Sequence, residues 1–227
     1  DVFVELLDES PALKEKSSAA AVDFLTGYAF GHRAAAQEAL SAVAAEHRGD
    51  VARLAETLPE TAAAPADEAA PATVGALAAG VLGELFAQFA AEIDARPDTA
   101  DDLHQLRITG KRVRYAMEVF AGLYPPAFRE VLYPAVERVQ SVLGDVQDGH
   151  VGLRRVTAVA SRVWAVRPAT AGRVMPGLAA LAEELRGQVS GGRKAFKEWV
   201  KEWRALTAEH LPDEALRPAA PPGEVTS

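Results

Sequence analysis

Basic side chains are concentrated in residues 102–120, where no acid occurs between Asp102 and Glu118. At about 100° per residue, a helix over this stretch places most of its cations within roughly a third of its circumference. The candidate binding residues here are His104, Arg107, Lys111, Arg112 and Arg114. Arginine binds phosphate oxygens in bidentate fashion, lysine acts as a compact point charge, and a protonated histidine donates from both ring nitrogens. This spacing therefore predicts an anion-binding edge.

A second basic face occurs near the end of the chain, in the stretch GRKAFKEWVKEWRAL. On a helix its cations share a face of about 100° beside an apolar face that contains Trp199 and Trp203. Its candidate binding residues are Arg193, Lys197, Lys201 and Arg204. If the two helices are neighbours, their basic edges converge on one groove. The alternative is an ordinary solvated face beside tryptophans of the core.

Charge is distributed unevenly along the chain. The net charge is −8, yet residues 1–103 carry 6 basic against 19 acidic side chains and residues 104–227 carry 18 against 13. The second part is therefore net positive, which fits an anionic partner, whereas the acidic first part argues against nucleic acid. The basic side chains have an alternative role as ion-pair partners of those acids.

The sequence offers little support for catalysis. Its five histidines show no metal-ligand spacing, cysteine is absent, and no glycine-rich phosphate loop or nucleophile motif occurs. The only cluster that suggests a metal site is His150 with Asp145 and Asp148. We expect a protein that is not an enzyme, with no cofactor and no metal.

Hydrophobic periodicity predicts helices throughout and no strands, and hence an all-α helical bundle. The expected helices cover residues 17–47, 50–58, 74–95, 102–120, 127–143, 148–166 and 177–210. We expect a kink at Pro134, a break at Gly144 to Asp148, a connection over Pro168 to Pro176 and a division near Gly191. One domain should cover residues 1–211, with an acidic Pro/Ala-rich loop at 59–73 and a disordered tail at 212–227.

The first long helices carry an apolar stripe that predicts burial. Its members are Val22, Leu25, Ala29, Ala36, Leu40, Val43, Val51, Leu54 and Leu58. The longest apolar run, residues 74–93, is interrupted by Glu84, Gln88 and Glu92, so we expect no membrane span. Without cysteine or a signal peptide, a soluble protein of a reducing, cytoplasmic compartment is the expectation.

Two sequence patterns resemble the second half of a CHAD domain, the conserved-histidine α-helical domain. The first is His-x-x-Arg-x-x-x-Lys-Arg-x-Arg-Tyr over residues 104–115, and the second is Val-Gln-x-x-Leu-Gly-x-x-Gln-Asp over 139–148. The family's usual residues at Val139 and Gln147 are Leu and Asn. The resemblance is strongest over residues 99–155 and weaker over 17–58 and 177–206.

The resemblance implies two related helical halves around a basic channel that binds inorganic polyphosphate, and association with polyphosphate granules. The family's first-half His-x-x-Arg helix is missing from this sequence, so the first half is expected to be truncated. Its partner would then be a second copy of the chain or the missing N-terminal helices. The alternative function is a protein-interaction or scaffold domain that docks an acidic partner or regulates a phosphate-processing enzyme.

Overall fold

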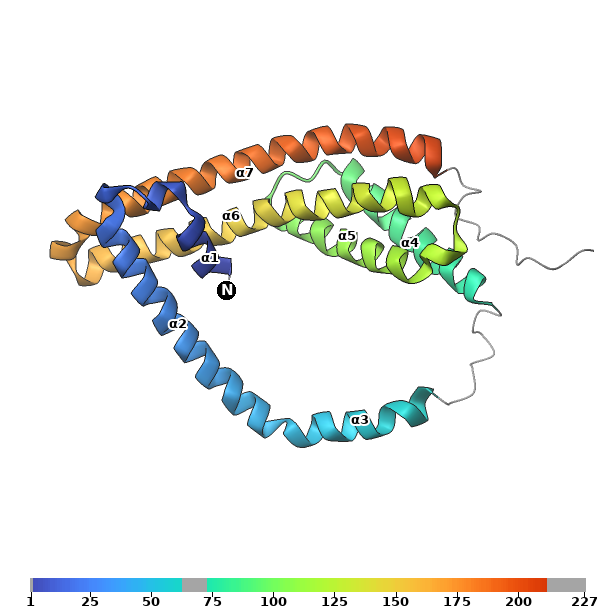
Figure 1. Ribbon diagram of the computed structural model, residues 1–227, viewed down its shortest axis with the longest axis horizontal. Helices are drawn as coiled ribbons and strands as arrows, with labels where there is room; N and C mark the ends of the chain where they lie inside the picture. The colour runs from blue at the N-terminus through green and yellow to red at the C-terminus, as the bar shows by residue number, and fades with distance from the viewer. Residues whose placement is uncertain (1, 63–72, 212–227) are drawn as a thin grey trace, which may run out of the picture. The chain divides into compact units, whose positions relative to one another are not determined.

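The structure is a computed structural model that describes residues 2–62 and 73–211, and within these ranges it contains helices and no strands (Figure 1). The helices are α1 (Val2–Glu9), α2 (Ala19–Glu46), α3 (Arg48–Ala62), α4 (Val74–Asp94), α5 (Ala100–Phe120), α6 (Tyr133–Val166) and α7 (Pro168–His210). Short 3-10 turns cover Pro11–Leu13, Lys16–Ser18 and Ala121–Leu123, and a π-helical turn covers Phe128–Leu132. The all-α prediction is confirmed.

The chain divides into two compact units. Unit 1 contains residues 1–70 and 155–184, and unit 2 contains residues 71–154 and 185–227. Both α6 and α7 contribute one part to each unit. Residues 63–72 of the expected loop and the expected tail at 212–227 lie outside the described residues, whereas α3 continues to Ala62 and makes residues 59–62 helical.

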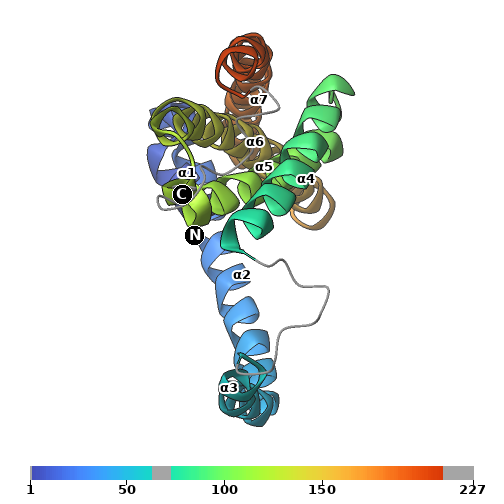
Figure 2. The same cartoon turned by 90° about the vertical axis from the view of Figure 1, so that its right-hand side faces the viewer.

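Unit 2 is a bundle of α4, α5, the first part of α6 and the second part of α7, which lie side by side in both views (Figures 1 and 2). Aromatic rings fill its centre. Phe89 packs edge-on against Trp199 and Trp203, whose rings stack at 5.3 Å, and the Trp199 indole donates to the Ala135 carbonyl at 2.8 Å. The prediction that both tryptophans lie beside the basic face, in the core, is confirmed because each is less than 5% exposed.

The predicted break at Gly144 to Asp148 is wrong, because α6 is one helix of 34 residues. A glycine costs a helix only about 1 kcal/mol relative to alanine, which close packing can offset. Close packing of this kind occurs at Gly149, where an added Cβ would lie 2.7 Å from Val189 of α7. The expected kink at Pro134 falls at the second residue of α6, directly after the π-helical turn.

The predicted connection over Pro168 to Pro176 is also wrong, since α7 starts at Pro168 and runs for 43 residues with Pro176 inside it. Pro168 occupies the first helical position, where its missing N–H costs nothing. Gly191 and Gly192 do not divide the helix either. A Cβ on Gly192 would meet Val146 at 2.5 Å, so this glycine allows close approach to α6.

Within unit 1, the first residues of the chain pack on α7. The Glu184 carboxylate accepts from the Ser10 hydroxyl at 2.7 Å and from the Ala12 amide at 2.9 Å. A Cβ on Gly177 would overlap Ala21 of α2 at 2.5 Å, and Leu25 and Ala29 are buried as predicted.

The rest of the predicted stripe is not buried. Every residue from 31 to 58 is exposed, including Leu40 at 61% and Leu54 at 59%. No described helix of unit 1 covers this face of α2 and α3. Val22 is half-buried, at the end of the stripe that does pack.

By length and composition, helix α4 is apolar enough to cross a membrane. Its Leu82, Phe86 and Phe89 belong to the core of unit 2. Buried core helices can be as long and as apolar as membrane-spanning helices, so this feature is weak evidence for a membrane span. Leu77, near the start of the helix, is 42% exposed.

Candidate anion-binding site

Helix α5 is fixed at its start and along one face. Its N-cap residue Thr99 accepts from the Asp102 amide at 3.1 Å and donates to the Asp102 carboxylate at 2.6 Å. Thr109 donates to Glu92 of α4 at 2.8 Å, and Leu106 and Val113 are fully buried. These contacts direct the opposite, basic edge of α5 away from the core of unit 2.

Arg107 lies where α5 meets α6. Its carbonyl accepts from the Gln140 amide at 3.2 Å, and its guanidinium lies beside Gly144, where a Cβ would be 3.8 Å from Nε. The Nε atom is buried and has no hydrogen-bond partner among the described residues. Gly144 therefore leaves space for a guanidinium whose buried N–H has no protein acceptor, and such a donor calls for a ligand or water.

Arg114 differs from its neighbours because it has an acidic partner. Its Nη1 lies 3.1 Å from Glu118, one helical turn further along, and its guanidinium stacks 4.7 Å from the centre of the Tyr115 ring. Tyr133 of α6 donates to the same carboxylate at 2.7 Å, and this hydrogen bond, together with burial, raises the pKa of Tyr133. Glu118 thus neutralises Arg114 in part.

Three cations form what we call the α5 edge, namely His104, Arg107 and Lys111. His104 is exposed, while the other two are half-buried. Among the described residues, no carboxylate forms an ion pair with any of the three. Arg112 also lacks such a partner, but it follows Lys111 and points about 100° away from it.

Of the four candidate cations of α7, which we call the α7 row, three have acidic partners. Arg204 lies 2.6 Å from Asp94, Arg193 lies 3.4 Å from Asp98, and Lys201 lies 2.9 Å from Glu198. Within the described part of the chain, Lys197 is the member of this row without an acidic partner. Asp94 and Asp98 come from the end of α4 and the turn to α5, so two of the α7 cations bind acids that are distant in sequence.

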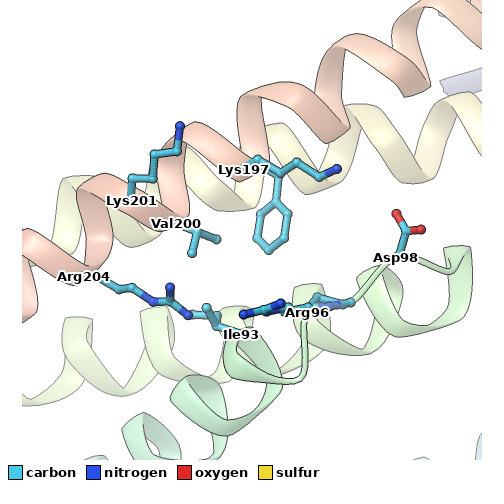
Figure 3. A pocket seen from close by; sticks show the side chains of 9 residues that line it. Ile93, Arg96, Asp98, Lys197, Val200, Lys201 and Arg204 are labelled. Atoms are coloured by element: carbon cyan, nitrogen blue, oxygen red, sulfur yellow. The ribbon is translucent and has the colours of Figure 1, made fainter.

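An open cavity of about 430 Å³, the α7 groove, lies between α7 and that turn (Figure 3). It is lined by Ile93, Arg96, Pro97, Asp98, Phe196, Lys197, Val200, Lys201 and Arg204. None of the α5 cations lines it. From the sequence we expected the two basic rows to converge on one groove if their helices were neighbours. In the structure the α7 groove is lined by cations of α7 and by Arg96, and by none of α5.

A family model of the CHAD domain matches residues 1–157. The chain belongs to the CHAD domain family. The match includes the whole α5 edge with Gln140 and Gly144, and it ends before α7, so the α7 candidates receive no support from the CHAD match. Searches of curated proteins and of solved structures returned no match.

Sequence reasoning missed the surroundings of His150 in this CHAD protein. No group of three potential metal ligands exists among the described residues, so the proposed cluster with Asp145 and Asp148 does not form there. Burial and then repulsion from Arg193 and Arg154 lower the pKa of His150, and its buried Nε2 has no hydrogen-bond partner among the described residues. The contribution of Arg154 follows from its position four residues along α6, whereas that of Arg193 has no local signal because Arg193 lies on α7.

Proposed function

We propose that this CHAD protein binds inorganic polyphosphate along the α5 edge. The observation that carries the proposal is the absence of acidic partners for His104, Arg107 and Lys111 within the described residues, combined with the buried, unpartnered Nε of Arg107. A cation that is paired with a carboxylate must lose that ion pair before it binds phosphate. The three cations of the α5 edge have no such ion pair with a described residue.

The spacing of the α5 edge suits a chain of phosphates. Residues three or four apart on a helix lie about 5 Å apart along its axis, so successive cations can contact nearby phosphates of one polymer. Arg107 offers a planar fork and Lys111 a point charge, a combination that suits phosphate oxygens. Partial burial of both stems limits the rotamer entropy that binding must remove.

The proposal assigns no chemical step to the protein. Because the whole chain is net −8, binding depends on the local positive field of the second part of the sequence. If the protein binds polyphosphate, we expect it at polyphosphate granules in the cytoplasm.

Calorimetric titration with phosphates of increasing length tests the proposal. We expect long-chain polyphosphate to bind at least about tenfold more tightly per binding site than tripolyphosphate, and orthophosphate to bind more weakly still, because each further phosphate adds a contact worth of order 1 kcal/mol. Equal affinity at every length would contradict the proposal and favour the rival function, docking of an acidic protein. Tighter binding of an oligonucleotide would favour nucleic acid instead.

A charge-matched pair of variants locates the site. Arg107→Ala with Lys111→Ala should weaken binding of long-chain polyphosphate by about tenfold or more. The control is Lys14→Ala with Arg53→Ala, two exposed cations of unit 1, which removes the same charge. Equal loss in both double variants would show that only net charge matters.

A further inference from the structure

We propose that the α7 groove binds a small amphiphilic anion, a molecule with one apolar body and one phosphate or carboxylate group. The inference does not depend on polyphosphate binding at the α5 edge, because the two sites share no residue. It rests on an apolar floor, a cationic rim and the backbone conformation of Arg96.

The floor of the groove is apolar. Ile93 and Phe196 are 4% and 5% exposed and belong to the core of unit 2, and the half-buried Val200 packs against that core. Pro97 adds a fourth apolar surface from the turn. A volume of about 430 Å³ lies within the range of small-molecule sites, about 300–1,000 Å³.

The rim is cationic and only partly neutralised. Four cations line the groove, and Asp98, the single carboxylate in the lining, is already bound by Arg193 at 3.4 Å. Neither Arg96 nor Lys197 has an acidic partner among the described residues. Figure 3 shows Arg204 reaching in from α7 and Arg96 lying on the opposite wall, with Ile93 between them.

Arg96 has a backbone φ of 56° and is the only non-glycine residue with a positive φ in the described part of the chain. It follows the C-cap Ala95 of α4, a position that glycine usually occupies because a side chain is disfavoured there. An arginine at this position places a guanidinium at the mouth of the groove at a cost in backbone energy. Strain of this kind is concentrated at functional sites.

These features together select the class of ligand. A bare phosphate chain would leave the apolar floor in contact with water, and a neutral apolar molecule would crowd the rim cations without compensating their charge. A molecule with an apolar body and an anionic group covers the apolar floor and compensates the charge of the rim cations.

Calorimetry with 2-naphthyl phosphate tests the inference against 2-naphthol, which lacks the anion, and orthophosphate, which lacks the apolar body. We expect 2-naphthyl phosphate to bind at least about tenfold more tightly than either. Equal binding of 2-naphthol, equal binding of orthophosphate, or no binding of 2-naphthyl phosphate would overturn the inference.

Two substitutions on α7 place the ligand in the groove. Lys197→Glu should weaken binding of 2-naphthyl phosphate by about tenfold or more, while Lys194→Glu, an equal charge change on an exposed residue outside the lining, should not. Arg96→Gly should weaken binding while leaving the melting temperature unchanged or raised, because glycine suits the positive φ. Equal effects of the two lysine variants, or unchanged binding in Arg96→Gly, would refute the groove as the site.

Arg107→Ala with Lys111→Ala separates this inference from the proposed function. That double variant should bind 2-naphthyl phosphate with unchanged affinity although it loses polyphosphate. A parallel loss of both ligands would mean that one site binds both and would overturn the groove assignment.

Discussion

The α5 edge and the α7 row look alike in the sequence and differ in the structure. Both are helical rows of cations beside an apolar face that packs into the core of unit 2. The α5 edge has no acidic partners among the described residues, whereas three of the four α7 candidates bind Asp94, Asp98 or Glu198. A basic stripe thus indicates an anion site only after the charges opposite it are known.

The difference arises from the surfaces that face each row. Where α5 meets α6, the facing residues are the neutral Gln140 and Gly144, which contact Arg107 without compensating its charge. Where α7 meets the end of α4, the facing residues are Asp94 and Asp98. Exposed ion pairs contribute little to stability, so pairing changes the availability of the α7 cations more than it changes the fold.

The largest expected effect is that of reversing a charge on the α5 edge. Arg107→Glu should weaken binding of long-chain polyphosphate about a hundredfold, because it removes charge-assisted hydrogen bonds worth about 1.5–3 kcal/mol and adds repulsion. Arg162→Glu, the same change at an exposed arginine of α6 that forms no ion pair with a described residue, is the control, and calorimetry measures both. Equal losses would remove the distinction between the α5 edge and the rest of the surface.

Substitution of Gly144 tests whether the space beside Arg107 matters. Gly144→Met should crowd the guanidinium and weaken polyphosphate binding by about tenfold, judged from the loss of one charged contact. Gly144→Ala is the matched control, because its Cβ would make ordinary contacts at 3.8 and 3.9 Å and alanine favours the helix by about 1 kcal/mol. Titration and thermal melts of both variants check this, and a loss of binding in Gly144→Ala would contradict it.

Removal of the acids should make the two rows more alike. Asp94→Asn with Asp98→Asn frees Arg204 and Arg193, and we expect polyphosphate binding to tighten by about two- to fivefold, the scale of a surface ion pair. The control is Glu38→Gln with Glu56→Gln in unit 1, which changes net charge equally. If both double variants gain the same affinity, pairing with the acids is not what distinguishes the α7 row.

The smallest effect concerns stability and His150. Because burial and the charges of Arg193 and Arg154 lower its pKa, the unfolded chain takes up a proton near pH 6.5 that the folded chain resists, and stability is lost as pH falls below about 6.5. His150→Gln should therefore show a smaller fall in melting temperature between pH 7.5 and 5.5 than the parent. An equal fall in both proteins would argue against a depressed pKa at this residue.

Much of the fold follows from local patterns. The apolar spacing of α4 and α5 predicted both helices to within a few residues, because this signal is local. Gly144 and Pro176 led to wrong predictions of a helix break and a connection. Both α6 and α7 continue through these residues, because long-range packing outweighs the local cost of a glycine or a proline in a helix. The stripe on α2 and α3 predicted amphipathic helices correctly but could not show whether anything covers them.

The candidate site is predictable to the level of residue type and helix face. That Arg107, Lys111 and His104 lie along one edge follows from their spacing alone. That Asp94 and Asp98 pair with α7, and that Arg96 joins the α7 groove, depends on contacts across about 100 residues of sequence, which periodicity does not encode.

The most direct test of the central claim is a crystal structure with bound tripolyphosphate. We predict phosphate oxygens within hydrogen-bond distance of the Arg107 guanidinium and the Lys111 ammonium, in line along α5. Phosphates bound only to Arg204, Lys201 and their neighbours on α7, with none on the α5 edge, would contradict it.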